Sequence, residues 1–285
     1  MVEGAVFTSR IASYPTRARD QLTPQCPRWL TEAAVWVLAA AFLYGAPRTA
    51  VAAEIKVFSA GAVRAAVQEL APAFEHSTHH SLAITYGTAG ALRATLDKGA
   101  PADIVILPRE AVAEAEANGS IQPATRRDLA HVAIGLAVRT GTRLPDISTP
   151  EALKRALQDA HAVAYVDPTR GTSGRYFDQV VLPALGIASE VRAKAKLQSE
   201  GSAAEFLRRG EADIAVQQIS ELLSVEGVTV VGPLPAPLQK VSTYSAAVTV
   251  NARAPELAQE LIDFLSTPAS QAVFKARGMD AVPVP

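Results

Sequence analysis

Strand-like runs alternate with helix-like segments along most of this 285-residue chain. The runs with strand character, which are rich in β-branched residues, are EIKVFSA (54–60), SLAITYG (81–87), ADIVILP (102–108), HVAIGLAVR (131–139), HAVAYVD (161–167), ADIAVQQ (212–218), VTVVGP (228–233) and STYSAAVTV (242–250). Helix candidates lie near 60–74, 90–98, 109–118, 149–159, 173–185, 203–209, 254–266 and 268–277. This alternation predicts an α/β protein with mostly parallel sheets, in which ligands bind beyond the carboxyl ends of the strands.

The N-terminal segment has a different composition from the rest of the chain. Four arginines between positions 10 and 28 precede an uncharged apolar run at 33–46, and AVA at 50–52 provides small residues for cleavage. This pattern predicts a signal peptide and N-terminal extension over 1–52, which is cleaved on export. The alternative is an uncleaved anchor, although the apolar run is shorter than the roughly 20 residues of a membrane span.

Cysteine content and charge exclude several kinds of site. The single cysteine, Cys26, precedes the apolar run, so the exported part has no thiol for a disulfide, a nucleophile or a metal site. A net charge of −1 gives no reason to expect nucleic acid as a partner. An anion must therefore be held by a local site.

One short motif occurs twice. SAGAVRA begins at Ser59 and TAGALRA begins at Thr88, each where a strand is expected to end and a helix to begin. We expect both hydroxyls to cap their helices, and Ala60 and Ala89 to leave the next backbone N–H groups open to an anion. The alternative is that each copy is only a favourable helix start.

A third loop has a similar character. DPTRGTSGRYF (167–177) follows an expected strand, and Thr172 and Ser173 are placed to cap the next helix. The loop has no P-loop lysine and no G-x-S-x-G motif, which disfavours a nucleotide site and a serine hydrolase.

Arginines cluster near these three loops, at positions 64, 93, 109, 170 and 175. Helical side chains lean towards the helix N-terminus, so Arg64 and Arg93 are expected to reach the mouths of their own loops. Arginine is the usual bidentate partner of a carboxylate. We expect one or two of the five to touch a ligand and the rest to be solvated.

HSTHH at 76–80 is the only histidine cluster in the sequence. It lies at the opposite end of the expected strands from the ligand loops, which favours a polar loop over a metal site. We expect no metal and no cofactor.

The order of the motifs resembles that of the periplasmic molybdate-binding protein family, within the two-lobed substrate-binding proteins of ABC importers. The matching stretches, spread over 54–280, are VFSAGAV, YGTAGAL, GAPADIVIL, VDP…GTSG, GSAAEFLRRGEADIAV and AQELIDFLSTPASQAVFKARGM. The resemblance implies a class II type fold, with two mostly parallel sheets flanked by helices and joined by two crossing strands. Lobe 1 would comprise 53–133 plus 247–285, and lobe 2 would comprise 134–246.

The resemblance also implies a function. A periplasmic, monomeric protein would capture a small anion, either molybdate or tungstate or a carboxylate, and deliver it to an inner-membrane ABC permease. The residues that match the family's site are Ser59, Thr88, Thr172, Ser173, the N–H groups at Ser202 and Ala203, and Gln217 with Gln218. Gln217 stands where the family commonly has a tyrosine, and the second loop has few hydroxyls. These departures and the added arginines suit a carboxylate better than a bare oxyanion.

An enzyme that resembles this family offers an alternative. Aconitate isomerase moves a double bond between cis and trans tricarboxylates, which requires proton transfer and cationic clamps. The candidate clamps are Arg64, Arg93 and Arg175, and the candidate proton-transfer groups are Glu221, Tyr176 and Asp167. No catalytic residue is assigned from the sequence. A third alternative is a binding protein for a neutral or unrelated organic solute.

Overall fold

The computed structural model describes residues 52–282. Its strands are β1 (Glu54–Ala60), β2 (Ser81–Gly87), β3 (Ile104–Pro108), β4 (Arg127–Arg139), β5 (Val163–Val166), β6 (Ala195–Gln198), β7 (Ile214–Gln218), β8 (Val228–Pro233), β9 (Val241–Val248) and β10 (Asp280–Ala281). All eight expected strands are present, with ends that differ by a few residues. The expected signal peptide, up to Val51, and Cys26 lie outside the described residues.

The helices begin and end close to the expected positions. They are η1 (Gly61–Val63), α2 (Arg64–Thr78), α3 (Ala89–Asp97), α4 (Arg109–Ala117), α5 (Pro150–Asp159), α6 (Thr172–Tyr176), η2 (Phe177–Val181), α7 (Leu182–Leu185), α8 (Ala188–Ala193), α9 (Ala204–Arg208), α10 (Ile219–Leu222), η3 (Ala236–Leu238), α11 (Pro255–Leu265) and α12 (Pro268–Ala276). The single helix expected over 173–185 is divided by η2, a π-helical segment that precedes Pro183. Proline has no N–H to donate, which interrupts regular α-helical bonding there.

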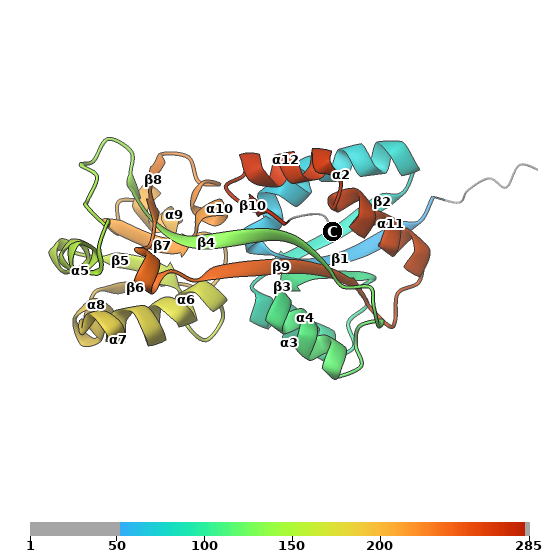
Figure 1. Cartoon of the computed structure of the whole chain (residues 1–285), viewed down its shortest axis with the longest axis horizontal. Coiled ribbons are helices and arrows are strands. Elements are labelled where there is room, and N and C mark those ends of the chain that lie inside the picture. Colours follow the sequence, from blue (N-terminus) through green and yellow to red (C-terminus); the bar gives the residue numbers. More distant parts are fainter. Residues whose placement is uncertain (1–51, 283–285) are drawn as a thin grey trace, which may run out of the picture. The chain divides into compact units, whose positions relative to one another are not determined.

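The described strands form one sheet in the order β2-β1-β3-β9-β4-β7-β5-β6, with β8 and β10 paired to β4. Strand β1 is parallel to β2 and β3, and β5 is parallel to β6 and β7. Strands β4 and β9 are antiparallel to each other and join the two parallel sets (Figure 1). The expected two-lobed architecture is therefore confirmed, with two parallel sets of strands joined by two crossing strands, but the two sets belong to one continuous sheet rather than to two separate sheets.

Hydrophobic packing follows this division. One cluster combines buried side chains from 55–132 with others from 244–279, and two further clusters are built from residues within 134–238. All five residues of β3 are buried, as expected of a strand covered by helices on both faces. The lobe boundaries at 133/134 and 246/247 stay predictions, because β4 and β9 run without a break through both parts.

Helix ends carry the signals expected from the sequence. Thr149 caps α5 by accepting a hydrogen bond from the N–H of Ala152 at 3.1 Å, with Pro150 as the first helical residue. Gly119 and Gly210 follow helices with φ of +73° and +72°, a conformation that favours glycine. Within residues 52–282, no helix is both long and apolar enough to cross a membrane.

Candidate functional site

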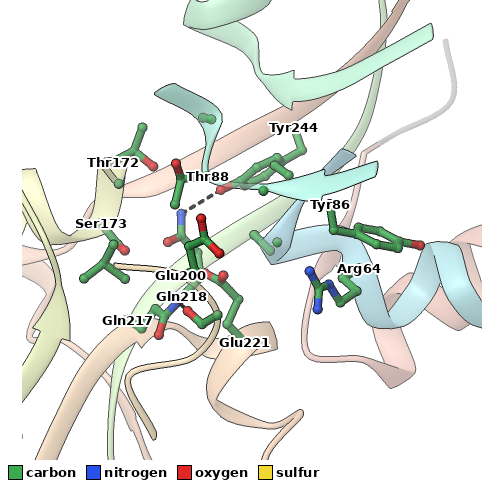
Figure 2. A pocket seen from close by; sticks show the side chains of 18 residues that line it. Arg64, Tyr86, Thr88, Thr172, Ser173, Glu200, Gln217, Gln218, Glu221 and Tyr244 are labelled. Atoms are coloured by element: carbon green, nitrogen blue, oxygen red, sulfur yellow. Dashed lines mark hydrogen bonds between the residues drawn. The ribbon is translucent and has the colours of Figure 1, made fainter. Parts of the chain in front are cut away.

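A cavity of about 90 Å³ lies where β1, β2 and β7 end and where α6 begins. Its walls come from both parallel sets of strands and from Tyr244 on β9. Figure 2 shows Thr172 and Ser173 on one side, Arg64 and Tyr86 on the other, and Glu221 among the side chains between them. The cavity lies beyond the carboxyl ends of parallel strands, where an α/β fold is expected to bind a ligand.

The first copy of the doubled motif does not place its hydroxyl in this cavity. Strand β1 continues through Ser59 to Ala60, so the residue that precedes η1 is Ala60, which has no side-chain cap. Ser59 is fully buried, and the nearest acceptor to its hydroxyl is the carbonyl oxygen of Ala60 at 3.5 Å. The prediction that Ser59 caps the helix is wrong, because Ser59 lies within β1 and Ala60 is the residue that precedes η1. Ala60 lines the cavity and Ser59 does not.

The second copy follows the prediction at its start. Thr88 caps α3 by accepting a hydrogen bond from the N–H of Ala91 at 3.3 Å, and Thr88 and Ala89 both line the cavity. Arg93 does not reach it. Its guanidinium donates to Asp97 at 2.9 Å and to the carbonyl oxygen of Ala111 at 3.1 Å. The expectation that Arg93 turns towards its own loop is therefore wrong, because two helix surfaces hold its side chain elsewhere.

Helix α6 forms the third entrance. Thr172 and Ser173 line the cavity, but they are the first two helical residues, and the N-cap is Gly171 without a side-chain bond. The expected capping role of these hydroxyls is wrong. A Cβ on Gly174 would collide with the carbonyl oxygen of Val166, so only glycine lets α6 pack this closely on the end of β5.

The two glutamines that end β7 are almost fully buried and have different partners. Gln217 accepts a hydrogen bond from the N–H of Ala203 at 2.6 Å and donates to the carbonyl oxygen of Gly201 at 3.3 Å. Gln218 donates to the hydroxyl of Tyr244 at 3.0 Å (Figure 2). Gln217 therefore fixes the 201–203 loop, and Gln218 ties β7 to β9.

Two polar groups of the Ser202–Ala203 segment have partners within the protein. The N–H of Ala203 is bonded to Gln217, and the hydroxyl of Ser202 donates to the carbonyl oxygen of Glu221 at 3.0 Å. Neither residue lines the cavity. The N–H of Ala203 is therefore already satisfied within the protein, and the contact of these two residues with a ligand stays a prediction.

Arg64 is the only cationic side chain among the described residues that line the cavity. Its guanidinium carbon lies 4.6 Å from the centre of the Tyr86 ring, a cation-π arrangement. Burial raises the pKa of Tyr86 to about 12, and Arg64 acts in the opposite direction. Tyr86 therefore stays neutral at physiological pH and leaves the charge of Arg64 available to a ligand.

The other arginines near the loops have partners elsewhere. Arg109 pairs with Asp128, Arg170 lies 3.4 Å from a carboxylate oxygen of Glu200, and Arg175 donates to the carbonyl oxygen of Pro168 at 3.2 Å. One arginine of the five therefore lines the cavity. Within 52–282 no group of three histidine, cysteine or acidic side chains is placed to hold a metal ion, the HSTHH segment included.

Glu221 on α10 is the acid at the centre of the site. Its carboxylate lies so close to Gly61 that a Cβ there would be 2.7 Å from Oε1. Burial raises the pKa of Glu221 from 4.5 to about 7, while Gln217 and Arg64 act in the opposite direction. The sequence contained the signal for this residue, since it follows the expected sixth strand, but its depth in the cavity could not be predicted.

Three contacts bring the two parts of the sheet together around the cavity. The hydroxyl of Ser220 donates to the carbonyl oxygen of Ala62 at 2.6 Å, and Gln218 reaches Tyr244 as described. A Cβ on Gly90 would lie 3.3 Å from the carbonyl oxygen of Arg170. The loops of both sets of strands therefore close on one enclosed polar site.

Comparison with known proteins identifies the family. The profile of the family described as bacterial extracellular solute-binding protein matches residues 55–280. An aconitate isomerase from Pseudomonas sp. is 32% identical over 234 residues, which cover 80% of this chain and 88% of the relative.

Solved structures share the fold at low sequence identity. The periplasmic molybdate-binding protein of Azotobacter vinelandii matches with a TM-score of 0.68 at 20% identity, covering 81% of this chain and 100% of that one. The sulfate-binding protein SubI of Mycobacterium tuberculosis matches with a TM-score of 0.67 at 18% identity, covering 81% and 87%. These matches agree with the resemblance expected from the motif order. The chain belongs to the bacterial extracellular solute-binding protein family.

Proposed function

We propose that this protein is exported to the periplasm, where it captures a small carboxylate-bearing anion as a monomer and delivers it to an inner-membrane ABC permease. The observation that carries the proposal is the cavity in which Arg64 is the only cation among the described residues and Thr88, Thr172 and Ser173 supply hydroxyls. A guanidinium binds a carboxylate through two parallel hydrogen bonds. The hydroxyls and the amide of Gln218 would hold the remaining polar groups of the ligand.

The composition of the cavity favours an organic anion over a metal oxyanion. Arg64 is the only cation among the described residues that line the cavity. The lining also contains two acidic residues, Glu200 and Glu221, against one arginine. A fully ionised oxyanion has no proton to donate to these acids and would be repelled by them. A larger organic acid can place its charge at Arg64 and its uncharged part elsewhere.

Ligand binding tests the proposal. The exported part of the chain is freed of ligand by unfolding and refolding, and its thermal unfolding is compared with molybdate, tungstate, sulfate, cis-aconitate and trans-aconitate. A ligand that binds only the folded form raises the melting temperature. We expect a rise with a carboxylate, and at least a tenfold loss of affinity in Arg64→Met but no loss in the matched control Arg93→Met. A rise only with molybdate or tungstate would contradict the carboxylate assignment.

A second candidate function is the isomerisation of aconitate, which is favoured by the 32% identity to an aconitate isomerase and by the position of Glu221. A pKa near 7 lets one carboxyl group both accept and return a proton at neutral pH. In this step a base takes a proton from the carbon next to a carboxylate, and the electron pair of that C–H bond forms the new double bond. The old double bond then accepts a proton at its far carbon.

Proton NMR decides between binding and turnover. Incubation of the wild-type protein with trans-aconitate in D₂O either yields the cis isomer or leaves the spectrum unchanged. Turnover that is lost in Glu221→Gln would establish the isomerase and the role of this carboxyl group. Binding without any change of isomer would leave the solute-binding function.

A further inference from the structure

The carboxylate of Glu221 lies beside Gly61, in the first copy of the doubled motif. It lies over Gly61, against the start of η1, where a Cβ would stand 2.7 Å from Oε1. Ser220, next to it in α10, donates to the carbonyl oxygen of Ala62 at 2.6 Å and so fixes α10 against η1. The chain therefore places an acid of its own beside the first entrance to the cavity.

The charged and titratable groups that line the cavity with Glu221 are few. They are Arg64 from α2, Tyr86 from β2, Tyr244 from β9 and Glu200 from the loop before α9. Burial raises the pKa of Tyr86 and that of Tyr244, so both stay neutral near pH 7. Glu200 lies at the rim with Arg170, which offsets its charge. Arg64 is thus the one cation shared by Glu221 and any incoming anion.

We propose that Glu221 determines specificity in this cavity by requiring the bound anion to share a proton with it, so that the protein selects organic acids and rejects fully ionised tetrahedral oxyanions. This inference rests on the proposed function. Two ionised carboxylates in one enclosed site repel each other, and one of them then binds a proton. A single proton between two such oxygens forms a short, charge-assisted hydrogen bond. Sulfate is a much weaker base than a carboxylate, so it shares such a proton less well and more of the repulsion remains.

Calorimetry at several pH values tests this proposal with trans-aconitate, sulfate and molybdate as probes. Binding is measured at pH 6, 7 and 8 in two buffers of different ionisation heat, which counts the protons taken up. The proteins are the wild type, the isosteric variant Glu221→Gln, and Glu226→Gln as a matched control at an exposed turn a few residues away. In Glu221→Gln, calorimetry still counts any proton that the ligand itself takes up. The difference in proton uptake between this variant and the wild type therefore belongs to Glu221.

When they bind trans-aconitate at pH 8, the wild type and Glu226→Gln should each take up close to one proton more than Glu221→Gln does. Their affinity for trans-aconitate should fall by up to tenfold per pH unit above 7. Glu221→Gln should bind with little dependence on pH and gain at least tenfold in affinity for sulfate or molybdate. Equal proton uptake in the wild type and Glu221→Gln would overturn the proposal, and so would tighter binding of sulfate than of trans-aconitate by the wild type. If the wild type binds none of the three anions, the proposed function fails. The role of Glu221 is then supported if Glu221→Gln gains binding of sulfate or molybdate, and refuted if it does not.

Discussion

Replacement of Glu221 by glutamine should stabilise the ligand-free protein at neutral pH. The carboxyl group of Glu221 is held in a buried site that raises its pKa from 4.5 to about 7. A folded-state pKa above the unfolded value means that the folded protein binds the proton more tightly, so stability is greatest below pH 4.5 and is lost as the pH rises through 7. Glutamine keeps the shape of the side chain and removes this loss.

The size of the effect follows from the two pKa values. Each unit of pKa is worth about 1.4 kcal/mol, so the difference between 4.5 and about 7 corresponds to about 3 kcal/mol. For a domain of this size, each kcal/mol changes the melting temperature by about 2–4 °C. Relative to the wild type, Glu221→Gln should therefore gain about 6–12 °C between pH 4.5 and pH 8.

Thermal and urea unfolding of the ligand-free proteins over pH 4.5–8 measure this gain. The quantity to follow is the difference in unfolding free energy between Glu221→Gln and the wild type, because the other titrating groups cancel in it. Glu226→Gln should show no such trend, since its side chain is exposed. The reasoning would be refuted if the difference in unfolding free energy between Glu221→Gln and the wild type stayed constant across this pH range. Glu221 would then titrate alike in the folded and unfolded states.

Three further substitutions probe the framework of the site. Gly174→Ala forces a Cβ into the carbonyl oxygen of Val166 and should cost at least about 3 kcal/mol in unfolding free energy, measured by urea titration. Ser220→Ala removes the buried hydrogen bond to Ala62 and should weaken ligand binding by about threefold to tenfold in calorimetry, since that bond helps close the cavity. Asp178→Asn loses the charged partner of Arg192 and should cost about 1–2 kcal/mol at pH 7. Because Arg192 lowers the pKa of Asp178, that cost should disappear as the pH falls through the folded-state pKa, as acid titration of both proteins would reveal.

The fold was predictable because its main signals are periodic and local. Each long strand is a β-branched run, and the caps at Thr149, Gly119 and Gly210 act on their own helices. The elements that sequence reasoning missed are short. AKLQ in β6 contains no β-branched residue, and α10 is a single turn of four residues. Their conformation depends on strand pairing and packing that residues close in sequence do not specify.

The site was predictable at the level of loops and less so at the level of side chains. The loops after β1, β2, β5 and β7 all reach the cavity, as the parallel strands require. Whether a polar side chain faces the ligand depends on competing partners within the protein. Gln217 is a clear example, because its amide bonds to the backbone of Gly201 and Ala203, far along the chain from it.

The two copies of the doubled motif differ in how the helix begins and in the partners of their arginines. In the first copy a 3-10 turn follows β1, so Arg64 is the first residue of α2. In the second copy α3 begins at Ala89, which makes Arg93 its fifth residue. Arg93 then faces acids on its own helix and on α4.

The motif that looks symmetric in the sequence is therefore asymmetric in the site. The first entrance supplies a cation and has Glu221 beside it, while the second supplies a hydroxyl cap at Thr88 and no cation. A symmetric tetrahedral anion would make poor use of two entrances that differ in this way. A ligand with chemically different ends can place a carboxylate at Arg64, a shared proton at Glu221 and uncharged polar groups at Thr88 and α6, so the asymmetry itself argues for an organic acid.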